Sequence, residues 1–323
     1  MARKRKEETA HTFDDQTAEI TIQPISETIE KNYMPYAMSV IISRAIPEID
    51  GFKPAHRKLL YTMYKMGLLT GARTKSANVV GATMKLNPHG DASIYETMVR
   101  LTRGNETLLH PFIDSKGSFG KQYSRDMAYA AARYTEVKLD AFCQTIFSGI
   151  DKDAVDFQDN YDGTMKEPLL LPTAFPNILV SPNKGIAVGM ASNICSFNLS
   201  EICDGTIALL QNPDISLNEF MDIVVAPDFP GGASIEAIIK KVTDLVKEGK
   251  LKEVADIRDE IDLSGFKLTI DLRRGVDADK LMQKLYKMTP LQDHFACDFN
   301  VLIGNRPMEL GVMDILREWI KFR

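Results

Sequence analysis

Long apolar segments are missing from this chain of 323 residues. No apolar run reaches the ~18 residues that a membrane-spanning helix needs. The first residues, Arg3 to Lys6 followed by Glu7 and Glu8, contain no apolar stretch of the kind that forms a signal peptide. We therefore expect a cytoplasmic protein with no membrane partner.

Cysteines are few and scattered. None of the four stands in a Cys-x-x-Cys pair, which argues against a zinc site and against a secreted disulfide framework. The sequence also lacks internal repeats, low-complexity tracts and an Asp-x-Asp cluster placed for a metal ion. A hydrophobic content of 44% and a charged content of 26% are those of a globular protein that works in a reducing compartment.

Charge is unevenly distributed along the chain. The net charge of −5 alone speaks against a nucleic-acid partner. Residues 31–140, however, carry 16 Lys and Arg against 9 Asp and Glu, whereas residues 151–323 carry 19 against 28. The basic segment is typical of a local footprint for an anionic polymer, although chance clustering would give the same count.

The pattern of residues divides the chain into three segments. Residues 1–28 are polar and charged, which is typical of a flexible arm. Residues 29–150 alternate short helical patterns with glycine-containing turns, and residues 151–323 mix short apolar strand patterns with amphipathic helices. This order predicts an arm followed by two domains, with an α+β fold overall.

Two helices joined by a turn are predicted in the first domain. Pro54 opens one helix at its first turn, and Leu59, Met63 and Met66 form its buried stripe. After the loop around Pro88, Asp91 can accept from the exposed N–H groups of the next helix. That helix buries residues four and three positions apart, namely Ile94, Met98 and Leu101. The pair forms a helix-turn-helix outline, which many helical domains share.

The second domain is predicted to contain short strands between prolines. Residues 169–172 and 178–180 have the pattern of buried strands, and residues 266–272 alternate like a strand with one exposed face. Residues 236–249 and 277–288 have helical periodicity.

Four motifs in a fixed order resemble the A subunits of bacterial type IIA topoisomerases, those of DNA gyrase and topoisomerase IV. The first is Ser43-Arg44-Ala45-Ile46-Pro47 with the segment from Asp50 to Lys58, and Pro88-His89-Gly90-Asp91 follows. The third is the alanine-rich Arg133-Tyr134-Thr135-Glu136, and the fourth runs from Gly185 to Asn193. The resemblance covers the chain from about residue 26 onward and implies the N-terminal breakage-reunion region.

The resemblance implies that Tyr134 is the nucleophile that attacks a DNA phosphate and becomes linked to a 5′ end. A phenol with a pKa near ~10 leaves more easily than a serine alkoxide, so the link can be reversed. Charge grows on the phosphate during the attack, so cations must already surround it. The resemblance assigns that role to Arg133, Arg44 and His89. Without this context Tyr134 would be an ordinary half-buried aromatic residue.

DNA contacts are expected along the two predicted helices of the first domain. Four basic residues stand at the start of the first helix, where cations oppose the helix dipole: Lys53, His56, Arg57 and Lys58. Phosphates opposite them would offset that cost, although a solvated basic turn is the plainer alternative. Arg100 and Arg103 would extend the same surface. The resemblance makes Ile186 an apolar wedge between base steps, whereas its pattern alone fits a core residue of a strand.

The family's fold and partners complete these expectations. A helix-turn-helix, winged-helix-like DNA-cleavage domain precedes an α/β tower-type domain, and the chain stops at Arg323, before the coiled-coil exit gate. The resemblance implies that double-stranded DNA is the substrate. It also implies that the partner B subunit holds ATP and most of the Mg²⁺ ligands, and that the chain works as a homodimer within an A2B2 heterotetramer.

The sequence departs from the family pattern at four places. Asn87 replaces a usual histidine, and the loop before Lys53 is one residue short and lacks an arginine. The junction at 231–236 omits a longer strand-rich segment. Ala92 stands where a serine or threonine opens the helix, and with Glu96 it occupies the family's fluoroquinolone-binding positions, so a weaker drug response is expected.

Two other classes of protein remain open. A helix-turn-helix regulator explains the basic segment but not the motif around Tyr134. A tyrosine recombinase places its tyrosine near the C-terminus and needs no partner metal, whereas Tyr134 lies before the middle of this chain. Covalent attachment to 5′ rather than 3′ DNA ends distinguishes the topoisomerase from both.

Overall fold

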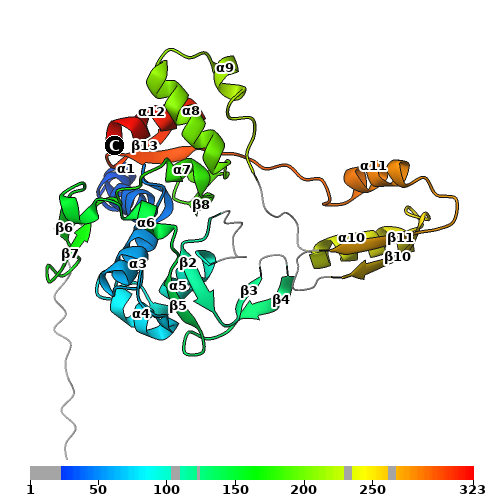
Figure 1. Ribbon diagram of the computed structural model, residues 1–323, viewed down its shortest axis with the longest axis horizontal. Coiled ribbons are helices and arrows are strands. Elements are labelled where there is room, and N and C mark those ends of the chain that lie inside the picture. Colours follow the sequence, from blue (N-terminus) through cyan, green and yellow to red (C-terminus); the bar gives the residue numbers. More distant parts are fainter. Residues whose placement is uncertain (1–22, 103–109, 122–123, 229–234, 261–266) are drawn as a thin grey trace, which may run out of the picture.

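The computed structural model describes residues 23–323 apart from 103–109, 122–123, 229–234 and 261–266. Figure 1 shows a main body and a smaller lobe, built from α10, α11, β10 and β11, that stands away from it. We call residues 235–291 the second lobe. Residues 1–22, most of the expected arm, and Arg103 lie outside the described residues.

A helical segment opens the described chain at residue 25, so the last part of the expected arm is helical. Its elements follow one another without a break: α1 (Ile25–Thr28), η1 (Ile29–Tyr33), α2 (Met34–Val40) and η2 (Ile41–Ala45). η1 and η2 are π-helical turns. Pro35 cannot donate to the preceding turn, and the wider η1 turn lies directly before it.

Helices α3 (Pro54–Lys65), α4 (Ser76–Thr83) and α5 (Asp91–Arg100) pack together beside a small sheet. The sheet has the antiparallel order β1-β5-β2, with strands β1 (Thr74–Lys75), β2 (Ile113–Lys116) and β5 (Glu136–Leu139). Pro54 starts α3 as predicted, and Leu59 and Met63 are fully buried. Met66 is 39% exposed because α3 ends at Lys65, so its predicted burial was wrong.

Ile94 and Met98 of α5 are buried as predicted, and so is Leu101, which directly follows the helix. Asp91 accepts from the N–H of Ala92 at 2.9 Å, but it is the first helical residue, and Gly90 occupies the cap position. The cap predicted at Asp91 was therefore wrong, because Asp91 lies inside the helix and, among the described residues, accepts only from the N–H of its neighbour Ala92.

The segment after the sheet is made of short hairpins and turns. Its elements are β3 (Phe119–Lys121), β4 (Ser124–Tyr129), α6 (Cys143–Ile146), η3 (Ile150–Lys152), β6 (Phe157–Asp159), β7 (Lys166–Pro168), α7 (Asn177–Val180), β8 (Asn183–Ile186) and β9 (Ala191–Ile194). The two strands expected at 169–172 and 178–180 were wrong. The first is a bend, and the second is the short helix α7, because an apolar run this short fits either structure.

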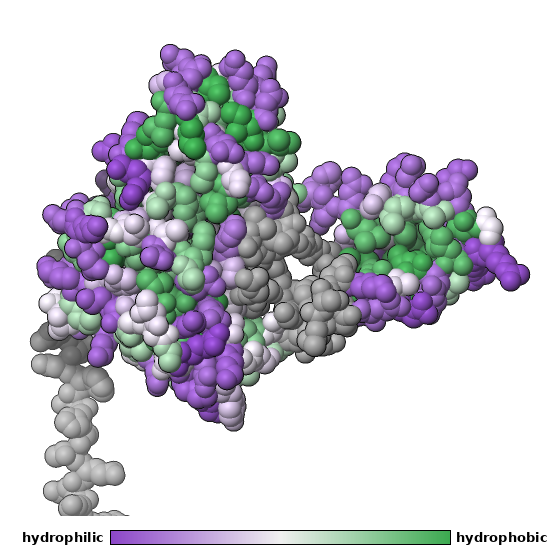
Figure 2. Space-filling view, in the orientation of Figure 1, coloured by the Kyte–Doolittle hydropathy of each residue, from purple (hydrophilic) through white to green (hydrophobic). Residues whose placement is uncertain are grey.

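Five further elements belong to the main body, two before the second lobe in the sequence and three after it. They are α8 (Leu199–Gln211), α9 (Leu217–Met221), β12 (Asn300–Ile303), β13 (Arg306–Glu309) and α12 (Val312–Phe322). One core joins Phe52 and Leu139 to Ile202, Val301 and Trp319, so buried side chains are continuous across the boundary expected at residue 150. Figure 2 shows hydrophobic surface near α8, where Leu210 is 60% exposed.

The second lobe has its own core. Its elements are α10 (Ile235–Lys247), the antiparallel pair β10 (Val254–Asp259) and β11 (Leu268–Leu272), and α11 (Ala278–Met288). Ile238, Val242 and Leu281 are buried between them. The two predicted helices are confirmed, as is the strand from residue 268 onward, and the chain has the mixed α+β composition expected. Among the described residues, no helix is long and apolar enough to cross a membrane.

Candidate functional site

Tyr134 lies on a tight turn directly before β5. Its N–H donates to the carbonyl of Ala131 at 2.9 Å, which closes the turn. The side chain is 65% exposed, although tyrosine usually buries its ring. The guanidinium carbon of Arg133 lies 4.7 Å from the centre of that ring. The turn therefore presents a phenol and a cation side by side to solvent.

Buried hydrogen bonds hold this turn against two helices. Thr135 is fully buried, and its hydroxyl donates to the hydroxyl of Ser76, the first residue of α4, at 2.7 Å. The N–H of Ser76 donates to the carbonyl of Thr135 at 3.0 Å. Tyr95 of α5 donates to the carbonyl of Ala130 at 2.6 Å and lies 3.0 Å from the Thr135 hydroxyl. Tyr134 is thus exposed on a turn whose backbone is fixed from both sides.

The start of α5 separates two pockets. One, which we call the basic pocket, includes Arg44, His89 and Ser93 in its lining. The other, the alanine pocket, includes Ala92 and Ala131. Successive residues of a helix point about 100° apart, so Ala92 and Ser93 face different pockets. Neither Arg133 nor Tyr134 lines the basic pocket, so within one chain the structure brings Arg44 to His89 but does not bring either to the tyrosine.

Carboxylates share the basic pocket with its cations. Glu48 is buried, and burial raises its pKa to about 7 against the opposing attraction of Arg57. Glu167 is also buried and lies 3.3 Å from the ammonium of Lys58. Its second oxygen, Oε2, has no hydrogen-bond partner among the described residues. The pocket therefore contains acidic groups that the motif analysis did not include.

The basic residues at the start of α3 contact groups of the protein itself, and only Arg57 among them is buried. Arg57 is 7% exposed and forms a bidentate pair with Asp50, with nitrogen-to-oxygen distances of 2.8 and 2.9 Å. Burial alone would lower the pKa of Arg57, but the charge and hydrogen bonds of Asp50 outweigh it and the net shift is upward. Lys58 donates to the carbonyl of Leu86 at 2.8 Å.

His56 and Lys53 differ from the expectation as well. Burial lowers the pKa of His56 to about 3, and the charges of Lys53 and Arg100 act in the same direction. His56 is therefore neutral at neutral pH and adds no charge to the turn. The ammonium of Lys53 donates to the carbonyl of Lys184. Of the four residues predicted as cations, Arg57 is paired with Asp50 and His56 is neutral. The unfavourable interaction of positive charge with the start of the helix is therefore offset within the chain.

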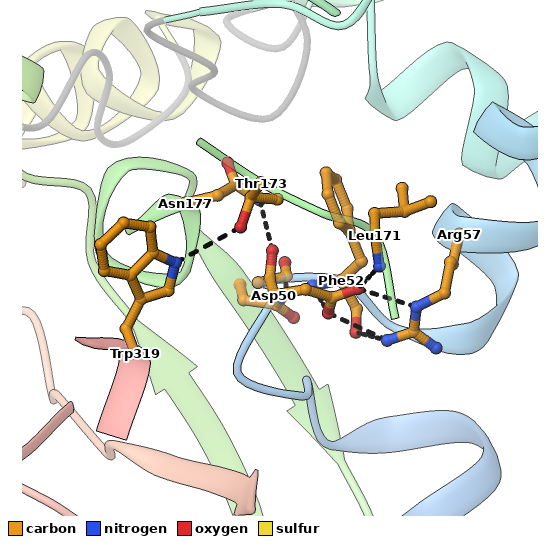
Figure 3. Close-up of polar contacts among 9 residues, drawn as sticks. Asp50, Phe52, Arg57, Leu171, Thr173, Asn177 and Trp319 are labelled. Atoms are coloured by element: carbon orange, nitrogen blue, oxygen red, sulfur yellow. Dashed lines mark hydrogen bonds and ion pairs between the residues drawn. The ribbon is translucent and has the colours of Figure 1, made fainter. Parts of the chain in front are cut away.

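Asp50 organises this region (Figure 3). Its fully buried carboxylate accepts from the backbone N–H of Phe52 at 3.1 Å and from that of Leu171 at 2.9 Å, besides Arg57. Its carbonyl accepts from the amide of Asn177 at 3.0 Å. A charged group with this many donors is satisfied without water. The hub ties the start of α3 to the 171–177 segment that leads to β8.

The β8–β9 hairpin presents Ile186 to solvent. Ile186 is 78% exposed, so the alternative of a core residue is wrong. Its neighbour Gly185 packs so tightly that an added Cβ would lie 1.9 Å from the carbonyl oxygen of Ala45. Ala45 ends the same π-helical turn that carries Arg44. The close approach at Gly185 therefore holds the strand that carries Ile186 against the turn that carries Arg44.

The remaining predicted residues lie on the outer face of α5. Ala92 is exposed at the edge of the alanine pocket. Glu96 forms an ion pair with Arg100 at 2.6 Å, and both side chains are about half exposed. The predicted drug-binding carboxylate is thus paired with a predicted DNA-binding cation. Among the described residues, no group of three or more His, Cys, Asp or Glu side chains is placed to hold a metal ion.

The sequence analysis assigned no role to Asp50, Thr135 or Glu167, although the first two lie within its motifs. Gly51, whose φ of +81° marks a tight turn, was the one local signal of the hub at Asp50. Partners 121 and 127 residues away, Leu171 and Asn177, leave no local signal.

Comparison with known proteins agrees with these motifs. A family model for the A subunits of DNA gyrase/topoisomerase IV matches residues 44–237 and 232–323. The DNA gyrase A protein of Halalkalibacterium halodurans is 37% identical over 344 residues, which covers 92% of this chain and 41% of that protein. The one from Neisseria gonorrhoeae is 35% identical, covering 97% and 39%, and that from Clostridium acetobutylicum 37%, covering 93% and 42%.

These alignments also bear on the junction at 231–236. The 344 aligned positions exceed the 323 residues of the whole chain, so the relative has residues with no counterpart here. The two matched ranges of the family model meet at 232–237, where a shortened segment was expected. The chain spans about two fifths of the length of these relatives. Its matched ranges nevertheless extend over nearly all of its own length, and the chain belongs to the family formed by the A subunits of DNA gyrase and topoisomerase IV.

Proposed function

We propose that this chain is the breakage-reunion part of an ATP-dependent type IIA topoisomerase and that Tyr134 breaks DNA by transesterification. The observation that carries the proposal is the exposed phenol on a rigid turn beside Arg133. The phenolic oxygen attacks a backbone phosphorus, the bond from phosphorus to the 3′ oxygen breaks, and the phenol proton is transferred to the leaving 3′ hydroxyl. The product is a 5′-phosphotyrosyl link, and the reverse attack by the 3′ hydroxyl reseals the strand.

Arg133 is the cation best placed for this step. Its guanidinium already lies over the Tyr134 ring, so it can contact a phosphate that reaches the phenol. Positioned positive charge stabilises the charge that develops on the phosphate. Arg44 and His89 provide a second cluster of donors in the basic pocket. Mg²⁺ and ATP are assigned to the B subunit, and Mg²⁺ would supply further charge stabilisation at the phosphate.

DNA binding is proposed for the surface that joins the turn, the basic pocket and the β8–β9 hairpin. Ile186, exposed and backed by Gly185, is suited to insert between base steps and bend the duplex. Arg44, exposed in the neighbouring turn, can contact the adjacent phosphate. We propose a homodimer within an A2B2 assembly, because two tyrosines must cut opposite strands with two-fold symmetry.

The test is covalent attachment of DNA to Tyr134→Phe in the presence of Mg²⁺ and the B subunit. We expect no protein-linked DNA after denaturation and nearly unchanged DNA affinity, because affinity comes mainly from phosphate contacts. Tyr161→Phe is the matched control, since Tyr161 is 59% exposed but lies outside the motif from Arg133 to Glu136. Protein-linked DNA from Tyr134→Phe, or attachment to 3′ ends by the wild type, would exclude the proposed mechanism.

A further inference from the structure

Two cysteines far apart in the sequence meet where the second lobe rejoins the body. Cys195 directly follows β9, and Cys297 lies in the segment between α11 and β12. Their sulfur atoms are 3.8 Å apart, and both are free thiols. Of the other two, Cys143 donates to the carbonyl of Phe112 and Cys203 lies on α8.

The backbone already aligns the two segments. Asn193 and Asp298 exchange two hydrogen bonds of 2.7 and 3.0 Å, which places residue 297 beside the end of β9. The amide of Asn300 donates to the carbonyl of Ala191 at 2.7 Å. A disulfide has a sulfur-to-sulfur distance of about 2 Å, so the two sulfurs must approach by roughly 2 Å, which side-chain rotation can supply.

The two thiols differ in their access to solvent. Cys297 is exposed, whereas Cys195 is 1% exposed. Burial, followed by the proximity of Cys297, raises the pKa of Cys195 to about 12. A dissolved oxidant therefore reaches Cys297 first, and Cys195 is protected from direct oxidation.

We propose that Cys195 and Cys297 form a reversible redox modification site, in which peroxide oxidises Cys297 and Cys195 then closes an intramolecular disulfide. In the first step the Cys297 sulfur attacks the O–O bond of hydrogen peroxide, which gives a sulfenic acid and water. In the second step the Cys195 sulfur displaces the hydroxyl group, which leaves as a second water with the thiol proton. Two thiols are oxidised by two electrons, and one peroxide is reduced to two waters.

The disulfide would link the segment that returns from the second lobe to the end of the β8–β9 hairpin. Residues 289–299 lead from α11 of the second lobe back to β12, and Cys195 continues the hairpin that carries Ile186. In a reducing cytoplasm such a pair stays open and closes only under oxidative stress. Closure would couple the position of the second lobe to the β8–β9 hairpin. The site itself does not depend on the proposed DNA chemistry.

The experiment is peroxide treatment of the protein in the presence of a metal chelator, followed by alkylation and peptide mapping. We expect the wild type to lose two free thiols and to yield one cross-linked peptide pair containing residues 195 and 297, reversible by dithiothreitol. Proteolysis within residues 289–299 should be slower in the oxidised form. Cys297→Ser, an exposed and conservative change, should abolish both effects, and Cys203→Ser, the matched control, should retain both.

Several results would overturn the proposal. Irreversible oxidation of Cys297 with Cys195 still free would show that the buried thiol does not close the bond. Cross-links between two copies of Cys297, seen as a dimer on a non-reducing gel, would show that the exposed thiol reacts between molecules. Slower proteolysis that persists in Cys297→Ser would separate the conformational effect from this pair.

Discussion

Arg57 and Arg44 belong to the same matched motif, yet the structure places them in opposite environments. Arg57 is 7% exposed and neutralises the fully buried Asp50, whereas Arg44 is exposed in the lining of the basic pocket. We predict that Arg57→Met lowers the free energy of unfolding by about 3–5 kcal/mol, because removing one partner leaves a buried charge without its counter-ion. Arg44→Met should change it by less than about 0.5 kcal/mol, as is usual for surface residues.

The two variants should differ in the opposite sense in DNA binding, which Arg44→Met should change and Arg57→Met should not. A cation that contacts a phosphate contributes about 0.9 to the slope of log affinity against log salt concentration. Arg44→Met should therefore reduce that slope by about 0.9 and weaken binding at low salt. Arg57→Met, measured where it is still folded, should leave the slope unchanged. Arg57→Lys keeps the charge but not the bidentate geometry, so its loss of stability should be smaller.

Urea unfolding and salt-dependent binding to one duplex measure both quantities on each variant. The reasoning would be refuted if Arg57→Met unfolded at the wild-type urea concentration while its salt slope fell. That outcome would mean that Arg57 contacts phosphate and that the Asp50 pair contributes little. If neither variant changed the slope of log affinity against log salt concentration, Arg44 would not belong to the proposed DNA surface.

Three further predictions concern packing, pH and drug response. Gly185→Ala should destabilise the protein by about 1–3 kcal/mol and weaken DNA bending, because the added Cβ would lie 1.9 Å from a backbone oxygen. Gly81→Ala is the control and should have neither effect, because the space around Gly81 is open. Unfolding and bending assays on both variants decide this. The folded protein lowers the pKa of His56 from 6.5 to about 3. The contribution of His56 to stability should therefore be complete above pH 6.5 and fall by up to about 1.4 kcal/mol per pH unit between pH 6.5 and about pH 3. Unfolding curves for His56→Gln that are as pH-dependent as those of the wild type would contradict this. Ala92→Ser should strengthen fluoroquinolone-stabilised cleavage ~2- to 12-fold by restoring a water-mediated contact of ~0.5–1.5 kcal/mol, and an unmoved drug midpoint in the reconstituted A and B subunits would count against that bridge.

The helical elements could be predicted because their signals are local. Pro54 starts α3, and the spacing of Ile94, Met98 and Leu101 identifies the buried face of α5. The strands expected at 169–172 and 178–180 failed for the opposite reason. An apolar run of three or four residues indicates that a segment is buried. Only the surrounding packing determines whether its backbone is helical or extended. The core likewise joins Phe52 to Trp319, residues more than 250 positions apart in the sequence, and no pattern along the chain indicates that they share a core.

The exposed and the buried members of the site differ in the same way. Family motifs identified Tyr134 and Ile186, and the structure leaves both at the surface, at 65% and 78% exposure. The same motifs could not distinguish Arg57 from Arg44, because the sequence shows the same residue type on a DNA surface and in a buried ion pair. The separation requires Asp50, whose other partners, Leu171 and Asn177, lie more than 100 residues away. A basic run at a helix start therefore indicates a DNA surface only after each cation has been checked for a carboxylate within the same chain.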